Sequence, residues 1–218
     1  MIQLKVCGIT QLADARFAAG AMVDYLGFIF YSGSPRYITP AKAKEIIGWI
    51  SGPQTVGVFV SQHADEINTT AAFTGVDMVQ VHGACTPNEA RFIEKPLIRA
   101  ISVKNDATAE ELCREAEKWV GTAACLLLDT HDDALAGGTG RSWDWSVLEK
   151  ADLPLPFFLA GGMNSDKVRS ALRILKPAGI DISSQLESSP GVKDFDKMEH
   201  FFEQWMQIQQ FTSNNSIG

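Results

Sequence analysis

The feature that most constrains the fold is a rhythm of short apolar runs that repeats along almost the whole chain. Neighbouring runs lie roughly 20 to 30 residues apart, and each is followed by a polar turn and a segment with helical periodicity. This alternation is typical of parallel strands joined by helices. The predicted strands centre on residues 4–6, 26–30, 56–60, 78–81, 98–101, 126–128, 157–160 and 179–182.

Helix starts are marked between several of these runs. Thr39 is followed by Pro40, which pairs a residue that caps helices with proline at the first helical position. Thr86 and Thr108 each have a glutamate three residues later, which is the pattern of a capping box. The sequence therefore predicts that helices begin soon after the strands they follow.

Two α/β architectures fit such a rhythm, a closed (β/α)8 TIM barrel and an open, doubly wound sheet. The first predicted strand is not followed by the glycine-rich GxGxxG turn of dinucleotide-binding open sheets. A count of eight strands, with an amphipathic helix opening at Asp194, favours closure. We expect residues 1–218 to form a single barrel domain.

Composition excludes several classes of partner. The chain has 19 Lys and Arg residues against 26 Asp and Glu, giving a net charge of -7 without any basic run. Nucleic acid and anionic membranes are therefore not expected partners. The beginning of the chain lacks a secretory signal, no apolar stretch is long enough to span a bilayer, and the four cysteines are scattered without metal-ligand spacing. These features predict a cytoplasmic protein without a metal site.

Two loops predict a phosphate site. In a TIM barrel, phosphate is usually bound by the loops after strands 7 and 8, at the C-terminal ends of those strands. Gly161 and Gly162 follow the seventh run and let an anion approach backbone N–H groups before a helix. Ser183 and Ser184 follow the eighth run and can face the same anion with hydroxyl and N–H groups. Each loop taken singly is also compatible with an ordinary turn.

Barrel closure places two reactive side chains on either side of this site. Strand 6 neighbours strand 7 and strand 1 neighbours strand 8, so Asp129 and Cys7, at the ends of strands 6 and 1, flank the phosphate loops. A thiol and a carboxyl in this arrangement are a candidate base and acid. We expect Lys5 to lower the pKa of Cys7 and apolar surroundings to raise that of Asp129. The residues by themselves leave open that Cys7 fills the core and that Asp129 caps a turn.

Other polar residues follow the strands. Arg36 comes after the second run, where its guanidinium could bind a carboxylate with two hydrogen bonds or simply lie on the surface. The glycine-rich residues 136–141 follow the sixth run in a long loop, which predicts a mobile cover over the site. His82 and His131 are near strand ends, but a lone histidine there is more often structural, and we assign them no role.

Several motifs, taken together and in order, resemble the phosphoribosylanthranilate isomerase family. Their spacing along nearly the whole chain distinguishes this family from other phosphate-binding barrels. The matching segments are residues 5–10, 27–30, 34–37, 56–59, 80–83, 128–129, 137–140, 143–145, 159–162 and 189–194. The resemblance implies a cofactor-free Amadori rearrangement in tryptophan biosynthesis, acting on a small phosphoribosyl substrate.

The resemblance also implies roles for individual residues. It makes Cys7 the general base and Asp129 the general acid, and it places Arg36 on the carboxylate of the anthranilate. It places Asp181 near the sugar. The phosphate is expected at Gly161, Gly162, Ser183 and Ser184. No metal is implied, and the sequence does not decide between a monomer and a homodimer.

The chain departs from the family pattern at two positions. Gln185 stands where the family commonly has glycine, which removes easy access to positive φ beside the phosphate, and Arg141 stands where lysine is commoner. Two rival functions remain: an isomerase or epimerase for another phosphosugar, and a barrel that binds a phosphate ligand without turnover. Arg36 separates the first from the family function, since a substrate without a carboxylate gives it no task.

Overall fold

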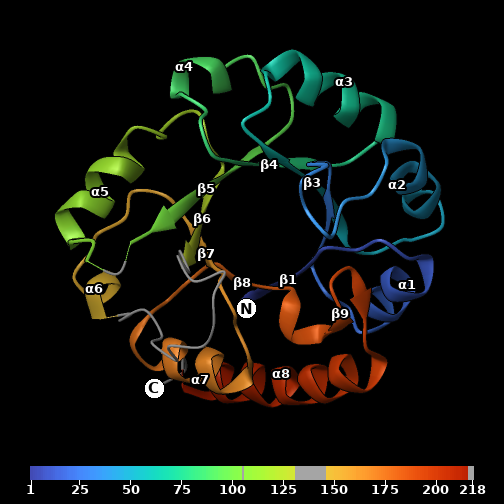
Figure 1. The fold of residues 1–218 in the computed structure, drawn as a ribbon. Coiled ribbons are helices and arrows are strands. Elements are labelled where there is room, and N and C mark those ends of the chain that lie inside the picture. The colour runs from blue at the N-terminus through green and yellow to red at the C-terminus, as the bar shows by residue number, and fades with distance from the viewer. Residues whose placement is uncertain (105, 131–145, 216–218) are drawn as a thin grey trace.

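The eight predicted strands close into a barrel of parallel strands with helices outside it (Figure 1). The computed structural model describes residues 1–104, 106–130 and 146–215. Each strand pairs with the next along the chain, and β8 pairs with β1 from Gln3↔Gly179 to Val6↔Ile182. The closed barrel is confirmed, and the open sheet is excluded. The strands are β1 (Gln3–Cys7), β2 (Tyr25–Ile29), β3 (Gln54–Val60), β4 (Met78–His82), β5 (Leu97–Val103), β6 (Cys125–Thr130), β7 (Phe157–Leu159) and β8 (Gly179–Ile182).

The helices begin where the capping residues predicted them. The Thr39 hydroxyl accepts a hydrogen bond from the Lys42 N–H, and both predicted capping boxes, at Thr86 and Thr108, are formed. None of the helices within the described residues is long and apolar enough to cross a membrane. The helices are α1 (Leu12–Gly20), α2 (Pro40–Ile47), α3 (Ala64–Thr74), α4 (Pro87–Ala90), α5 (Ala109–Glu117), α6 (Ser146–Glu149), α7 (Ser165–Ile174) and α8 (Phe195–Asn215).

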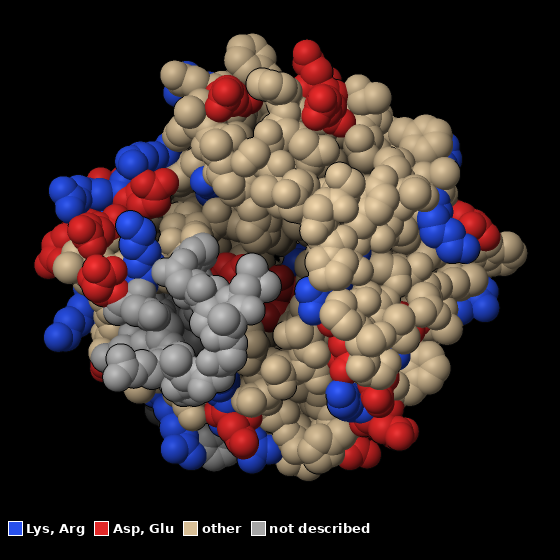
Figure 2. All heavy atoms as spheres, in the orientation of Figure 1, with Lys and Arg blue, Asp and Glu red and all other residues tan. Residues whose placement is uncertain are grey.

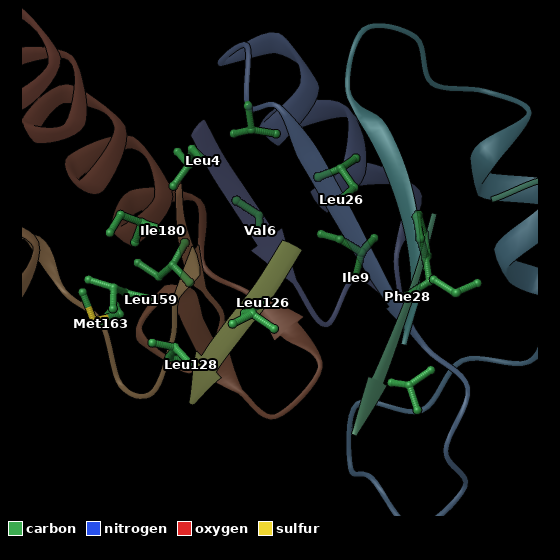
Figure 3. Close-up of a cluster of buried hydrophobic side chains, with 14 of the residues drawn as sticks. Leu4, Val6, Ile9, Leu26, Phe28, Leu126, Leu128, Leu159, Met163 and Ile180 are labelled. Atoms are coloured by element: carbon green, nitrogen blue, oxygen red, sulfur yellow. The ribbon is translucent and has the colours of Figure 1, made fainter. Parts of the chain in front are cut away.

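Alternate residues of each strand face two separate cores. On β1, Leu4 and Val6 belong to the layer between the barrel and the helices, whereas Cys7 belongs to the cluster inside the barrel. Figure 3 shows part of the outer layer, with Ile180 of β8 and Leu126 of β6 among the buried side chains. The period of two therefore sends Lys5 and Cys7 together into the barrel.

One segment departs from the simple strand–helix repeat. After β8 the chain forms a short 3-10 helix, η1 (Ser184–Leu186), and an antiparallel pair of strands, β9 (Glu187–Ser189) and β10 (Val192–Lys193), before α8 begins. The pair lies beside α1 in Figure 1. The Lys193 N–H donates to the Asp14 carboxylate of α1 at 3.2 Å, which holds the pair against α1.

Candidate active site

The sequence-predicted residues meet at the barrel face formed by the carboxyl ends of the strands. Figure 2 shows a hollow at the centre of this face, with acidic side-chain atoms inside it. Cys7 is the last residue of β1, Asp129 lies near the end of β6, and Asp181 is in β8. Since β7 and β8 lie between β6 and β1, Cys7 and Asp129 stand on either side of the two predicted phosphate loops.

A buried ion pair forms the floor of the site. The Lys5 ammonium donates to Asp181 Oδ2 at 3.0 Å, and neither side chain is more than 9% exposed. Burial by itself lowers the pKa of Lys5, but Asp181 and Cys7 beside it outweigh this and raise that pKa above its ordinary value. The second Asp181 oxygen, Oδ1, is buried without a hydrogen-bond partner among the described residues. It is a free acceptor at the place where the sugar is expected.

Cys7 is held tightly at the end of β1. Its side chain packs against Gly27 of β2, where an added Cβ would lie 2.7 Å from the sulfur. Its carbonyl oxygen accepts hydrogen bonds from the Ser183 hydroxyl at 3.0 Å and the Lys193 ammonium at 2.7 Å. Both the backbone and the thiol of Cys7 are therefore fixed by neighbouring elements.

Lys5 lowers the pKa of the Cys7 thiol, as expected, but the net shift of that pKa is upward. Burial raises the pKa of the thiol above its ordinary value, although Lys5 and Lys193 each act to lower it. The sequence showed the neighbouring cation but not the loss of water around the sulfur. Both ammonium groups favour the thiolate at this position.

Asp129 occupies the opposite side of the mouth. It is half-buried, and its Cα is paired with that of Ser102 in the ladder between β5 and β6. Leu127, two residues earlier on the same strand, belongs to the cluster inside the barrel. The alternation along β6 therefore directs Asp129 toward the same hollow as Cys7.

The two predicted phosphate loops, after β7 and β8, differ in whether their hydrogen-bond donors are free to bind an anion. Gly161 and Gly162 have φ values of 87° and 57°, a region that glycine enters without strain, and they lead into α7, which Asn164 caps. An added Cβ on Gly162 would lie 3.4 Å from the Lys167 ammonium, so a cation adjoins this loop. The Ser183 hydroxyl instead donates its hydrogen bond to the Cys7 carbonyl oxygen. The Ser183 Oγ can therefore still accept a hydrogen bond, but it has no proton left to donate to an anion.

Arg36 binds a carboxylate of the protein itself. Its guanidinium binds Glu187 of β9 through Nε, 2.9 Å from Oε1, and Nη2, 2.7 Å from Oε2. The hydrogen bond to Glu187 is the largest influence on the pKa of Arg36 and raises it. Nη1 makes no hydrogen bond to the described residues. The Nε–Nη2 edge of the guanidinium is therefore bound to Glu187, and the Nη1 edge remains available for a ligand.

Glu187 and Lys193 were missed by the sequence reasoning, although Lys193 lies in one of the quoted motifs. Both side chains are almost completely buried, and Lys193 Nζ lies 3.1 Å from Glu187 Oε1. Burial lowers the pKa of Lys193, with Glu187 opposing it. Two charged residues flanking a turn that contains Gly191 were the available signal. Their partners lie too far away in sequence to be inferred from it.

His82 also faces the mouth, from the end of β4. Its Nε2 lies 2.7 Å from the Gln80 amide nitrogen, so the ring accepts that hydrogen bond. Burial, together with Lys5 and Arg99, lowers the pKa of His82 to about 4. The ring is therefore neutral near pH 7 and is part of the wall that surrounds the candidate base.

A closed barrel with a thiol and a carboxyl at its mouth agrees with the comparisons to known proteins. A family model described as N-(5'phosphoribosyl)anthranilate (PRA) isomerase matches residues 4–204. The N-(5'-phosphoribosyl)anthranilate isomerase of Magnetococcus marinus is 41% identical over 201 residues, covering 92% of this chain and 93% of that relative. The chain belongs to the phosphoribosylanthranilate isomerase family.

Solved structures of phosphoribosylanthranilate isomerases have the same fold. The enzyme of Thermotoga maritima superposes with a TM-score of 0.84 at 33% identity, covering 94% of this chain and 98% of its own. A phosphoribosylanthranilate isomerase structure in complex with reduced 1-(o-carboxyphenylamino)-1-deoxyribulose 5-phosphate superposes with a TM-score of 0.80 at 32% identity. That structure covers 94% of this chain and 98% of its own.

The two departures from the family pattern have different outcomes. Gln185 lies in η1 and is not among the residues with positive φ, so this loop does not require the conformation that glycine would allow. Arg141, His131 and the predicted cover, residues 136–141, lie outside the described residues. Within the described residues, no three His, Cys, Asp or Glu side chains are grouped so that they could hold a metal ion.

Proposed function

We propose that this chain catalyses the Amadori rearrangement of N-(5'-phosphoribosyl)anthranilate to 1-(o-carboxyphenylamino)-1-deoxyribulose 5-phosphate, as its family membership indicates. The observation that carries the assignment of residues is the placement of Cys7 and Asp129 on either side of the loops after β7 and β8. A phosphosugar held by those loops would extend its reacting carbons between a thiol and a carboxyl. Such a pair can move the two protons that this isomerisation requires.

In the proposed reaction, Asp129 gives a proton to the ring oxygen of the ribose. The bond between that oxygen and C1 breaks, and the nitrogen lone pair forms a protonated imine. The Cys7 thiolate then removes the proton from C2, and the electron pair moves through C1 to the nitrogen. The resulting enamine tautomerises to the ketone, so the overall change is an isomerisation without an external oxidant or added cofactor.

The substrate-binding roles follow the same orientation. The phosphate lies against the N–H groups of Gly161, Gly162, Ser183 and Ser184, where the two glycines have no side chain to obstruct an anion. Asp181 Oδ1, which is a buried acceptor with no partner among the described residues, takes a hydrogen bond from a sugar hydroxyl.

Arg36 completes the proposed binding of the substrate. Its Nη1 edge, which Glu187 leaves unused, takes the carboxylate of the anthranilate. The test compares phosphoribosylanthranilate with phosphoribosylaniline, which lacks that carboxylate. We expect the wild type to prefer the first substrate and Arg36→Ala to lose most of this preference through a higher KM. An equal KM for both substrates in the wild type would favour a different phosphosugar isomerase.

The main experiment supplies freshly prepared phosphoribosylanthranilate and follows its consumption without added metal or cofactor. We expect Cys7→Ser and Asp129→Asn to lower kcat by about 100-fold or more with modest changes in KM, because each removes one proton-transfer group. Cys125→Ser is the matched control, since Cys125 is also a buried thiol in the barrel but lies at the opposite end of β6. No turnover by the wild type would overturn the proposal, and tight binding without product would favour the ligand-binding alternative.

We also propose that residues 1–218 act as one catalytic domain in the cytoplasm. The acidic composition and the scattered cysteines support this location. A single cooperative unfolding transition and recovery of the activity in the cytoplasmic fraction are the expected results. Two separate transitions would contradict a single domain.

A further inference from the structure

We propose that Lys193 is a positioning residue that joins the end of β1, which carries Cys7, to Arg36 through the carboxylate of Glu187. The inference rests on the proposed function and adds to it two residues that set the state of the base and the orientation of the carboxylate-binding guanidinium. Both come from the β9–β10 segment, which the simple strand–helix repeat does not contain.

The Lys193 ammonium uses all of its donors inside the protein. Nζ lies 2.7 Å from the Cys7 carbonyl oxygen, 3.1 Å from the Ser183 carbonyl oxygen and 3.1 Å from Glu187 Oε1. An ammonium has three N–H donors, so each contact takes one of them. Its side chain is 0% exposed. Lys193 therefore joins β1, the loop after β8 and β9 at one buried point.

Glu187 extends this connection to Arg36. Its Oε1 accepts from both Lys193 and the Arg36 Nε, and its Oε2 accepts from Arg36 Nη2. A carboxylate between two cations is held in one orientation, because moving it breaks hydrogen bonds on both sides. The orientation of the free guanidinium edge is set by Glu187.

The loops that carry these residues pack closely around the connection. An added Cβ on Gly8, directly after Cys7, would lie 2.8 Å from Arg36 Cδ and 3.1 Å from Ser183 Oγ. On the β9–β10 turn, the Gly191 carbonyl accepts a hydrogen bond from the Thr10 hydroxyl. A displacement of the β9–β10 segment would therefore reach both Arg36 and the end of β1.

Lys193 also belongs to the small set of charges that surround the candidate base. The charged groups that act on Cys7 are Lys5 on β1, Asp181 on β8, Lys193 on β10 and Arg36 on the loop after β2. Lys5 is already paired with Asp181. Removing the Lys193 ammonium leaves the thiolate with less compensating charge, so its formation requires a higher pH.

The test measures the Cys7 thiol directly and does not depend on turnover. The native chain is alkylated with iodoacetamide at a series of pH values, and modification of the peptide that contains Cys7 is followed by mass spectrometry. We expect Lys193→Met to move this pH profile of alkylation to higher pH by about half a unit or more. Lys193→Arg, which keeps a cation at this position, should have a profile close to that of the wild type. Lys42→Met, which breaks an exposed ion pair on α2, is the matched control.

Kinetics provide the second measurement. Lys193→Met should move the acidic limb of kcat/KM to higher pH by the same amount, whereas Glu187→Gln should raise KM about tenfold with a smaller change in kcat. An unchanged alkylation profile in folded Lys193→Met would mean that Lys193 has only a structural role, and it would overturn the proposal. If Lys193→Met does not fold, an unchanged KM in Glu187→Gln overturns it. Failure of the wild type to turn over would reject the proposed function and leave the alkylation test intact.

Discussion

His82 predicts a specific dependence of stability on pH. Its pKa in the folded protein is lowered to about 4, against 6.5 for an ordinary histidine. The unfolded chain therefore binds a proton more readily than the folded chain between these values. The contribution of neutral His82 to stability is fully present above about pH 6.5 and is lost as the pH falls toward about 4.

The size of this loss of stability follows from the lowering of the His82 pKa. Each pKa unit corresponds to about 1.4 kcal/mol, so the full loss is about 3 kcal/mol below pH 4 and about 2 kcal/mol at pH 5. A protonated ring also can no longer accept the hydrogen bond from the Gln80 amide nitrogen, 2.7 Å away. Lys5 and Arg99 repel the charged ring.

The assay is urea unfolding of the wild type and His82→Gln at pH values from 7.5 to 5. Carboxylates titrate in both proteins, so the difference between their free energies of unfolding isolates the histidine. We expect this difference to change by about 2 kcal/mol across the range, with the wild type losing more stability. His200→Gln, which replaces an exposed histidine on α8, is the control for the substitution itself. Parallel curves for wild type and His82→Gln would refute the assignment of a partly buried, neutral ring.

Three further predictions concern the barrel. Gly27→Ala should lower kcat about tenfold or more while the chain stays folded by circular dichroism, because its Cβ would lie 2.7 Å from the Cys7 sulfur; an unaffected kcat would mean that this thiol position is not used. Lys5→Met should lower the free energy of unfolding by about 3–5 kcal/mol, since it leaves Asp181 buried without its cation; a loss below about 1 kcal/mol would contradict the ion pair. Leu126→Ala should cost about 2–5 kcal/mol in the same urea assay, because Leu126 is completely buried; a much smaller loss would show that the core collapses around the cavity.

Local signals predicted the framework of the site well. The strand rhythm predicted all eight strands. The predicted runs extend one residue past β2 and β7, at Phe30 and Ala160, and β3, β5 and β6 are up to two residues longer at an end than the runs that predicted them. The capping residues Thr39, Thr86 and Thr108 predicted where helices begin. These signals work because strand alternation and helix capping depend on residues within a few positions of one another.

The charge state of the site was harder to predict from the sequence. The sequence places Lys5 two residues before Cys7, and the period of two directs both side chains inward, so the sign of their interaction was predictable. The net pKa of Cys7 was not, because burial depends on residues from several strands that pack inside the barrel. Solvent exclusion is a property of the closed structure.

The sequence by itself determined the closed barrel, the positions of Cys7 and Asp129 at strand ends and the family to which the motifs belong, because these depend on local periodicity and on the order of the strands. Only the tertiary structure decided that Glu187 holds one edge of Arg36, 151 residues away, and that Lys193 binds the carbonyl of Cys7, 186 residues away. Those contacts arise where the chain closes the barrel and β9–β10 returns to β1. No local pattern encodes which distant polar groups satisfy one another once water is excluded.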